Sequence, residues 1–524
     1  MKKKPGYCLT WLLVFSLLVG CTKKSDTHQA KSLAQEEILR LNFSYGDLPS
    51  LHPHELSMTG RGRAMGKWLF EGLSRRNQAG EYELTGAEEV TISSCQTRYI
   101  FKLRTLCYSD GSSVSAFDYE NAWKEAIAPN SKCAKADLFY CIKNAKHARE
   151  GKVALDQVGV KAINEKTLFV ELEHPTPYFL SLVSSCLFSP YKFSNDTLLF
   201  TGPYIVNEWK KDVSLKLTKN PFFKDQVAIK RIEITMIKEP RTALYLYEKG
   251  EFDWIGDPFS PIVEEDLETI QHSVAEQEVI RPFWIYLNTD FYPLSSPLMR
   301  RALSYAIDRE LIAKYIYFGC RPLTTILPKQ LSSCKASSHI DPTQAKELFE
   351  QALQELGLSR NTFPPLVLSC FSSNQSRKLA EYLKESWENV FGITITLDVQ
   401  EWNTFYQNLQ NRTYQVGGCF TSIDYEDPMA LLTRLAPNKM NFSNWNHPEY
   451  QDMMTKIRKE ANQTSRESLV KQVELLLEQE MPVISIFNQT LTYSCPNLEG
   501  LVFDYSGAPD LRWVRKKPAE SCCK

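Results

Sequence analysis

The sequence predicts an α/β fold, on two observations in its second half. Residues 342–356 carry apolar side chains at helical spacing, with Asp341 before them as a capping residue and Gly357 after them as a stop. Two apolar segments follow, at 366–368 and 393–399, with a second helical pattern between them. A strand, a helix and a strand in this order form a right-handed crossover with parallel strands.

The first half mixes both element types without this regular order. Apolar spacing predicts helices, and alternation predicts strands. Helical patterns occupy 64–73, 116–127 and a Cys- and Lys-rich stretch from there to 150, and strand patterns occupy 99–103, 158–163, 167–172 and, ending in a turn, 41–51.

Length and composition fit a large folded protein. The 524 residues are 43% hydrophobic and 12% aromatic, which excludes intrinsic disorder, and the length corresponds to roughly three or four domains. Basic and acidic residues balance at 61 and 62, and neither end carries a charged tail. This excludes nucleic acid as a partner held by overall charge. No repeat or Gly/Ser linker marks a domain boundary.

The N-terminus predicts export. Residues 1–20 combine three lysines with an apolar stretch at 9–19 that is too short to span a bilayer, which is typical of a signal peptide. The following Cys21 completes a segment that resembles a bacterial lipobox, in which Cys21 is lipidated after cleavage. The alternative is an ordinary signal peptide with an incidental cysteine. Residues 21–35 are polar and predict a tether.

Cleavage before Cys21 removes three lysines and no acid, so 58 of the 61 basic residues remain against 62 acidic ones, a net charge of −4. No later segment is long and apolar enough to span a membrane. We therefore expect a soluble body held on a membrane surface by lipid.

Twelve of the 14 cysteines remain after signal cleavage and lipidation, and export permits disulfides. Spacing alone does not fix the pairing. Cys95 with Cys107 and Cys320 with Cys334 are candidate local pairs, and the pairing stays open. The chain has no CxxC motif, which argues against a zinc knuckle or a thioredoxin-type site.

Motifs of catalysis are missing or imperfect. The segment 60–67, GRGRAMGK, resembles a phosphate loop, but its spacing is wrong and Trp68 stands where Ser or Thr should bind magnesium, so we expect a helix. His52 and His54 suggest a metal site, but Pro53 lies between them and no HExxH motif follows. No GxSxG elbow occurs. We expect neither catalytic activity nor a cofactor.

Four segments in order resemble the bacterial extracellular solute-binding proteins of family 5. They are SLHP with LFEGL at 50–53 and 69–73, YIFKLR with YSDG and FD at 99–104, 108–111 and 117–118, TGPY with Trp209 and NP at 201–204 and 220–221, and Asn288 with RRALSYAIDR at 300–309.

The resemblance implies a two-lobed periplasmic-binding-protein clamshell, type II-like, with an extra domain on the N-terminal lobe. Lobe I would consist of 36–60, 187–283 and 490–524, the extra domain of 61–186, and lobe II of 284–489. Such proteins close over short peptides, hand them to the transmembrane subunits of an ABC permease and catalyse nothing. The implied protein is a monomer, lipid-anchored on the periplasmic side of a bacterial cell envelope.

The resemblance also assigns ligand-binding residues. A peptide ammonium needs a buried acid, and Asp424, which lies 22 residues after Trp402, occupies the place of the acid in the family's ADY motif. The alternative for Asp424 is a turn or helix-cap acid before Pro428. Asp47 stands where the family often carries a second cleft acid, with a surface turn as the alternative.

Aromatic cleft positions are matched by Trp402, Tyr414 and Tyr425, although Trp402 and Tyr414 could equally be core residues. The sequence departs from the family where oligopeptide binders carry basic residues and a tryptophan, because those positions hold the residues Leu409, Gly418 and Thr421. The ligand carboxylate would then be held by Arg412 or another cation, or the ligand would be shorter or modified.

The expected function is that of a peptide-binding lipoprotein of an ABC importer. Three alternatives stay open: the same fold tuned to a muropeptide or a metal chelate, an enzyme such as a peptidase, and a surface adhesin or chaperone that reuses the clamshell.

Overall fold

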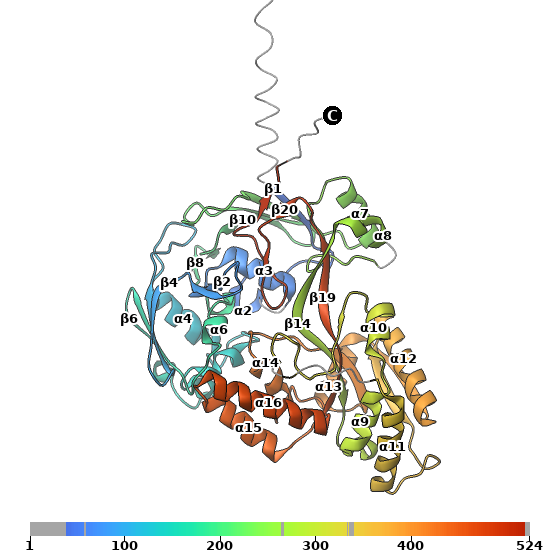
Figure 1. Cartoon of the computed structure of the whole chain (residues 1–524). Coiled ribbons are helices and arrows are strands. Elements are labelled where there is room, and N and C mark those ends of the chain that lie inside the picture. Colours follow the sequence, from blue (N-terminus) through green and yellow to red (C-terminus); the bar gives the residue numbers. More distant parts are fainter. Residues whose placement is uncertain (1–37, 57–58, 264–266, 333, 335–339, 519–524) are drawn as a thin grey trace, which may run out of the picture.

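The computed structural model describes residues 38–56, 59–263, 267–332, 334 and 340–518 (Figure 1). The expected signal peptide, Cys21 and the tether lie outside the described residues.

Lobe I contains a four-stranded sheet in the order β1-β12-β11-β10. The first pair is parallel and the other two are antiparallel. The strands are β1 (Ile38–Asn42), β10 (Tyr204–Lys210), β11 (Ser214–Lys219) and β12 (Arg231–Thr235). The first strand therefore lies earlier than the predicted range 41–51, because the chain already turns after Asn42.

The extra domain is built on an antiparallel sheet in the order β4-β5-β7-β6, which the helix α4 (Ala116–Ala126) contacts through β6 and β7. Three of these strands and α4 confirm the sequence patterns, since alternate residues of β5 are buried as predicted. The strands are β4 (Ala87–Ile92), β5 (Arg98–Leu103), β6 (Val160–Asn164) and β7 (Thr167–Glu171).

The predicted helical stretch up to residue 150 is only partly correct. It consists of a 3-10 turn at Ala136–Cys141 and the short helix α5 (Ala145–Arg149). The break between them lies at Asn144, whose φ of 62° is left-handed and incompatible with a continuous helix.

The largest sheet has the order β13-β19-β14-β18-β16-β17, with β15 paired to β19, and β14, β18, β16 and β17 bring it into lobe II. Its strands β16 and β17 are parallel, which confirms the predicted strand–helix–strand unit. The strands are β13 (Ile255–Gly256), β14 (Val274–Leu287), β15 (Arg321–Pro322), β16 (Leu366–Phe371), β17 (Ile395–Gln400), β18 (Val416–Phe420) and β19 (Val483–Ser494).

Eight helices of the described chain belong to this lobe. They are α9 (Pro297–Tyr305), α10 (Arg309–Tyr315), α11 (Pro342–Leu356), α12 (Asn374–Phe391), α13 (Trp402–Asn411), α14 (Met429–Leu432), α15 (Pro448–Lys459) and α16 (Gln463–Glu480).

Short elements complete the chain. The helices are α2 (Pro53–Leu56), α3 (Gly60–Leu69), α6 (Phe179–Leu182), α7 (Pro240–Glu248) and α8 (Leu267–Ile270), and the strands are β2 (Ser74–Arg76), β3 (Tyr82–Leu84), β8 (Lys192–Ser194), β9 (Thr197–Leu199), β20 (Leu498–Glu499), β21 (Val502–Phe503), β22 (Pro509–Asp510) and β23 (Arg515–Lys516).

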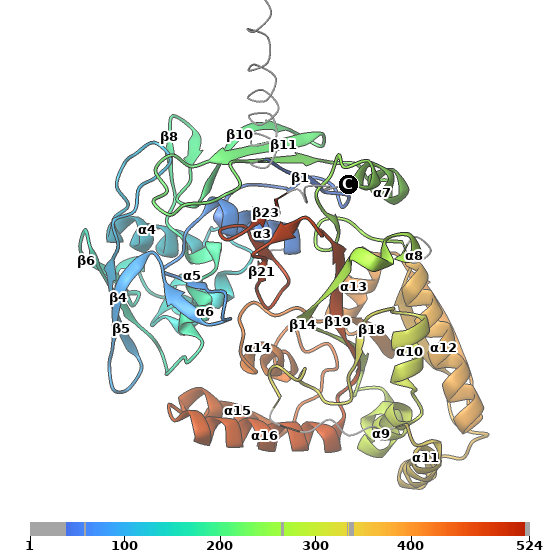
Figure 2. The same cartoon turned by 45° about the horizontal axis from the view of Figure 1, so that its top comes forward.

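The two lobes have separate cores. One buried apolar cluster is formed by residues within 39–259 and 493–514, and two others by residues within 280–487 together with Tyr505. The long paired strands β14 and β19 run from one body into the other (Figures 1 and 2). This arrangement is the two-lobed clamshell that the resemblance implied, and the two connecting strands are a finding of the structure.

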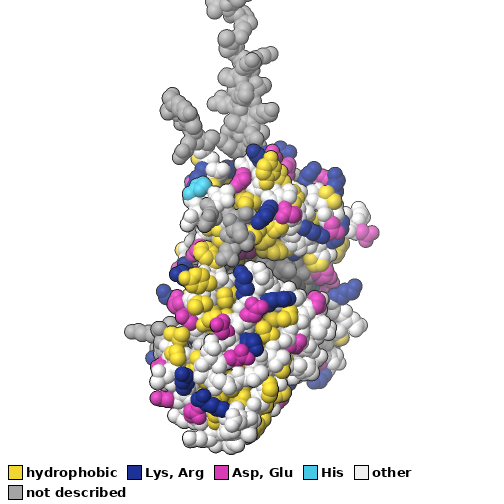
Figure 3. Space-filling model, turned by 90° about the vertical axis from the view of Figure 1, so that its right-hand side faces the viewer, with side chains coloured by type: hydrophobic (Ala, Val, Ile, Leu, Met, Phe, Trp, Pro, Cys, Tyr) yellow, Lys and Arg dark blue, Asp and Glu magenta, His cyan; other side chains and the backbone are white. Residues whose placement is uncertain are grey.

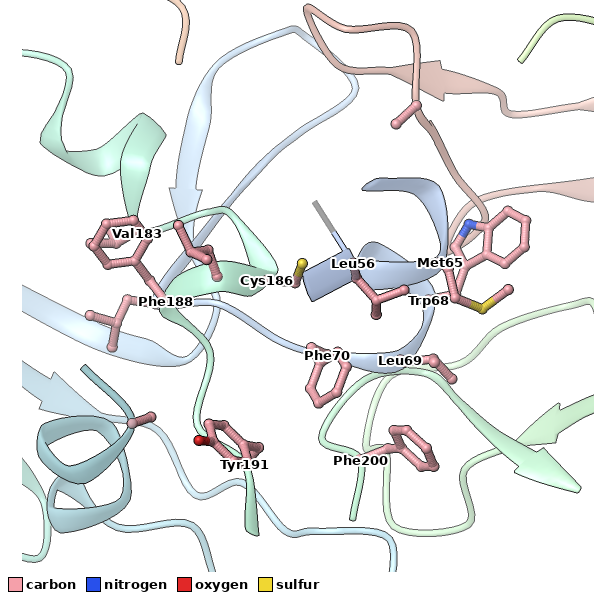
Figure 4. Packing of buried hydrophobic residues seen from close by; sticks show 14 of the residues in the cluster. Leu56, Met65, Trp68, Leu69, Phe70, Val183, Cys186, Phe188, Tyr191 and Phe200 are labelled. Carbon is pink, nitrogen blue, oxygen red and sulfur yellow. The ribbon is translucent and has the colours of Figure 1, made fainter. Parts of the chain in front are cut away.

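The segment GRGRAMGK forms the helix α3, as predicted, and not a phosphate loop. It begins at Gly60, four residues before the predicted start, because Thr59 caps it by accepting a hydrogen bond from the backbone N–H of Gly62. Its apolar face, with Trp68 and Leu69, is buried in lobe I beside Cys186 (Figure 4). Its polar side chains face the boundary between the lobes.

Neither candidate disulfide is present in the described chain. Cys95, Cys107, Cys320 and Cys334 are all free thiols, as are the other cysteines of the described chain. Proximity in sequence did not translate into pairing.

Candidate functional site

A cluster of charged side chains lies where the two lobes meet. It lines a cavity of about 30 Å³, and its members come from both lobes: Arg63, Lys67, Arg76, Asp424 and Asp504. A ligand site for a molecule of peptide size takes roughly 300–1,000 Å³. The cavity in this conformation is therefore too small for such a ligand, and β14 and β19 are the long paired strands that join the two lobes.

Asp424 is the centre of this cluster. Its Oδ1 lies 2.8 Å from Nη2 of Arg63 on α3, and its Oδ2 lies 2.8 Å from Nζ of Lys135 in the extra domain. The hydroxyl of Tyr505 donates to the backbone oxygen of Asp424. Burial alone raises the pKa of Asp424, but the charges of Arg63 and Lys135 outweigh it and hold the pKa below its usual range. Asp424 is therefore an ionised acid that faces the opposite lobe.

The next two residues also reach across the boundary. The ring of Tyr425 stacks on that of Tyr178, with centroids 4.2 Å apart and planes 11° from parallel. Glu426 lies 3.3 Å from Nη2 of Arg76 and accepts a hydrogen bond of 3.3 Å from the hydroxyl of Tyr82. The segment 424–426 of lobe II thus contacts residues of the range 61–186, which belongs to the extra domain on the N-terminal lobe.

The local structure shows which acid caps the helix that follows Asp424. The strand β18 ends at Phe420, and Asp427 accepts the hydrogen bond of 2.9 Å from the backbone N–H of Met429 at the start of α14. Asp427 also forms a buried pair of 2.7 Å with Arg466. The capping task considered for Asp424 therefore belongs to Asp427.

Asp47 lies elsewhere. Its carboxylate accepts hydrogen bonds of 3.1 Å from Nε1 of Trp209 and of 2.8 Å from the backbone N–H of Asp212, and it is 3.8 Å from Nζ of Lys211. These groups belong to the β10–β11 hairpin, so Asp47 holds a turn of lobe I. It is not among the residues that line the cavity at Asp424.

Two of the predicted aromatic residues are also remote from the cavity. Trp402 begins α13, is 44% exposed and packs against Phe371 and Tyr406. Tyr414 is buried in the core of lobe II, where its hydroxyl donates to the backbone oxygen of Phe442.

Arg412 is used within lobe II. Its Nε and Nη2 donate hydrogen bonds of 3.2 and 3.1 Å to the backbone oxygens of Asn441 and Asn438. Its φ of 60° ends α13 in the left-handed conformation. Of the predicted ligand-binding residues, Asp424 alone lines the cavity. Tyr425 follows it in the sequence and stacks on Tyr178.

Sequence reasoning missed the cations that contact Asp424. Arg63 and Lys135 lie 361 and 289 residues away from it along the chain. Arg63 is part of the GRGRAMGK segment, whose helical spacing places it on the polar face of α3. No local pattern indicates which acid that face meets.

Within the described ranges, no three side chains of His, Cys, Asp or Glu gather as metal ligands. Burial, with a smaller contribution from His52, lowers the pKa of His54 to about 3. No helix of the described chain is long and apolar enough to cross a bilayer.

Comparisons with known proteins place these features in context. The sequence model of "Bacterial extracellular solute-binding proteins, family 5 Middle" matches residues 81–442. The oligopeptide-binding protein OppA of Bacillus subtilis is 31% identical over 536 residues, which cover 96% of this chain and 98% of that protein. The periplasmic murein peptide-binding protein MppA of Escherichia coli is 25% identical over 80% of this chain and 82% of its own length.

Solved structures show the same fold. The oligopeptide-binding protein OppAIV of Borrelia burgdorferi superposes with a TM-score of 0.76 at 24% identity, covering 92% of this chain and all of that one. The unliganded open form of MppA gives a TM-score of 0.76 at 23% identity, covering 92% and 98% of the two chains.

Proposed function

The chain belongs to the bacterial extracellular solute-binding proteins of family 5, and from this premise we propose that it captures short peptides for an ABC importer. The observation that carries the proposal is Asp424, an ionised acid at the boundary between the lobes. The relatives named for oligopeptides and dipeptides support a peptide ligand. The protein would catalyse nothing and deliver its ligand to the permease.

Capture would proceed by exchange of cations on Asp424. When the lobes separate, the carboxylate leaves Arg63 and Lys135 and becomes available to the ammonium group of a peptide. Closure then removes the ammonium from water, which strengthens a charge-assisted hydrogen bond. A ligand that binds the closed form better than the open form shifts the population toward closure.

Peptide binding is testable by calorimetry. Titration with Ala-Ala-Ala is expected to give saturable binding at one site, with a negative heat-capacity change because closure buries apolar surface. Cleavage of the peptide would show an enzyme instead. A muropeptide that binds where no plain peptide does would move the function to that alternative, which the relative MppA supports.

We also propose that Cys21 carries a lipid that holds the protein on the periplasmic side of the cell envelope. Cys21→Ser is expected to move the protein from the membrane fraction to the soluble fraction, because lipid supplies most of the membrane affinity. An unchanged distribution between the fractions contradicts the anchor.

A further inference from the structure

A lysine of the extra domain contacts the binding acid in this conformation. Nζ of Lys135 lies 2.8 Å from Oδ2 of Asp424, and among the described residues Asp424 is its one hydrogen-bond partner. The other carboxylate oxygen, Oδ1, accepts a hydrogen bond of 2.8 Å from Nη2 of Arg63. Each oxygen of Asp424 is thus bound by a different cation of the protein itself.

The group that Lys135 presents has the same chemistry as the N-terminus of a peptide. Both are primary ammonium groups, with three N–H donors and one positive charge on a compact nitrogen. The guanidinium of Arg63 is planar and larger, so it is not an equivalent. Lys135 therefore occupies the place on Asp424 that the proposed function gives to the ligand.

The two cations are not held equally. Arg63 has a second anchor, because its Nη1 donates a hydrogen bond of 3.3 Å to the hydroxyl of Tyr505 and its guanidinium carbon lies 5.8 Å from the centroid of that ring. Lys135 has no such anchor for its ammonium group in the described chain. Its side chain is also more exposed than that of Arg63, at 22% against 13%. An incoming ammonium group therefore displaces Lys135 more easily than Arg63.

The backbone that carries Lys135 is held by the extra domain. Nη2 of Arg149, at the end of α5, donates a hydrogen bond of 2.9 Å to the backbone oxygen of Ser131. The backbone N–H of Leu138 donates one of 3.1 Å to the backbone oxygen of Lys135, and Leu138 lines the cavity beside Asp424. The turn is thus fixed in the extra domain, and its lysine side chain reaches across to lobe II.

Burial makes this pair stronger than an ordinary surface pair. On the face in Figure 3, cationic and anionic side chains are interspersed at the surface, and exposed pairs contribute little because water and salt screen them. The side chains of Lys135 and Asp424 are only 22% and 14% exposed, so their attraction is screened less. The contact is therefore strong enough to compete with a ligand.

From these contacts we infer that Lys135 is an internal competitor of the ligand's ammonium group and thereby determines how tightly free-amine peptides bind. The inference rests on the proposed function and adds a regulation of the same site, since lobe II closes either on Lys135 or on a peptide. The exchange replaces one primary ammonium group by another at Oδ2 of Asp424, so the charge beside the carboxylate stays the same. Asp137 lies on the same turn, close enough for the charge of Lys135 to act on it, and offers the displaced lysine another acid.

The size of the effect follows from the share of molecules in which Lys135 occupies Asp424. When only a fraction of the molecules is competent to bind, the apparent Kd rises by the inverse of that fraction. Occupation in about 70–90% of the molecules would weaken binding by about three- to tenfold. Removal of Lys135 would then tighten binding, whereas removal of a residue that holds the ligand would weaken it.

Calorimetry with Ala-Ala-Ala tests this direction. Lys135→Met keeps a long side chain without the charge and is expected to bind Ala-Ala-Ala about three- to tenfold more tightly than wild type. Lys135→Arg keeps a cation that can contact Asp424 and is expected to stay within about twofold of wild type. Lys132→Met changes an exposed lysine of the same loop and is the matched control, with unchanged affinity.

An N-acetylated peptide separates competition from a general effect on closure. Acetyl-Ala-Ala-Ala has no ammonium group that could replace Lys135 on Asp424. We therefore expect Lys135→Met to gain affinity for Ala-Ala-Ala but not for the acetylated peptide. An equal gain for both peptides would mean that Lys135 opposes binding in general, and the role of a competitor would be wrong.

Small-angle scattering without peptide gives a readout that does not depend on affinity. Because the contact joins the extra domain to lobe II, its loss in Lys135→Met is expected to raise the radius of gyration, and addition of Ala-Ala-Ala is expected to lower it again. A merely structural role of Lys135 would lower the melting temperature without tightening binding. Lys135→Gln replaces Lys135→Met if melting shows that the latter is not folded.

The outcomes separate the two proposals. If neither wild type nor Lys135→Met binds a tripeptide, the proposed function fails and the inference fails with it. If both bind Ala-Ala-Ala with equal affinity, peptide capture stands and the competitor is wrong. If Lys135→Met binds more weakly than wild type, Lys135 helps to hold the ligand, which also overturns the inference.

Discussion

Asp424→Asn is expected to weaken the binding of a free-amine tripeptide by roughly 10–100-fold, the effect of losing a charge-assisted hydrogen bond. The side chain of Asp424 is only 14% exposed, so water does not replace the missing charge well. The variant also leaves Arg63 and Lys135 unpaired in the closed form, which makes closure less favourable. Calorimetry with wild-type and variant protein measures the change.

Two controls make this result specific. An N-acetylated tripeptide has no ammonium group, so its affinity should change much less between wild type and Asp424→Asn. Asp452→Asn alters an acid of the same type in an exposed pair with Lys456 and should leave affinity unchanged. Equal binding of the free-amine peptide by wild type and Asp424→Asn would remove Asp424 from the ligand site.

Asp510→Asn is expected to destabilise the protein by about 3–5 kcal/mol, the effect of leaving one partner of a buried ion pair alone. Arg75 donates from Nη1 to both oxygens of Asp510, at 3.0 and 2.8 Å, and both side chains are 4% exposed. The adjacent buried pair Glu71–Arg512 extends the network. These contacts tie the C-terminal segment to lobe I, and urea unfolding measures their loss.

The effect of Asp510 depends on pH in a defined direction. Burial raises the pKa of Asp510, but the charges of Arg75 and Arg512 outweigh it, so the folded-state pKa lies below the ordinary value. Its contribution is therefore complete above the unfolded-state pKa of about 3.9 and is lost as the pH falls through the folded-state pKa. The stability difference between wild type and Asp510→Asn should shrink in that acidic range.

A surface pair provides the comparison. Glu350→Gln removes the partner of Arg360, where both side chains are 49% exposed, and should change stability by about 0–1 kcal/mol. If Asp510→Asn destabilises no more than Glu350→Gln, the buried network does not hold the C-terminal segment.

The fold was predicted correctly where the capping residues and the apolar periodicity indicated the same element. The helix α11 has the predicted bounds because the Asp341 carboxylate accepts from the backbone N–H groups of Thr343 and Gln344, and Gly357 ends the helix at a φ of 63°. Each of these signals lies within a few residues of what it determines. The same holds for the parallel strands β16 and β17, whose pairing follows from the helix between them.

For the site, the sequence predicted the acid of the motif but not the residues that contact it. Asp424 followed from a short resemblance, but its contacts with Arg63 and Lys135 join segments that the fold alone brings together. Asp47 was predicted to line the cleft, but its carboxylate accepts hydrogen bonds from the β10–β11 hairpin. That hairpin lies more than 150 residues further along the chain. Side chains without a local partner pattern need the tertiary structure for their assignment.

The most direct test of peptide capture is mass spectrometry of the ligand released when the purified protein is denatured. The account predicts short peptides with free N-termini. A metal chelate would keep the fold and change the substrate, as would a muropeptide. A protein that releases no ligand and binds no peptide from a panel would contradict peptide capture and favour an adhesin or chaperone.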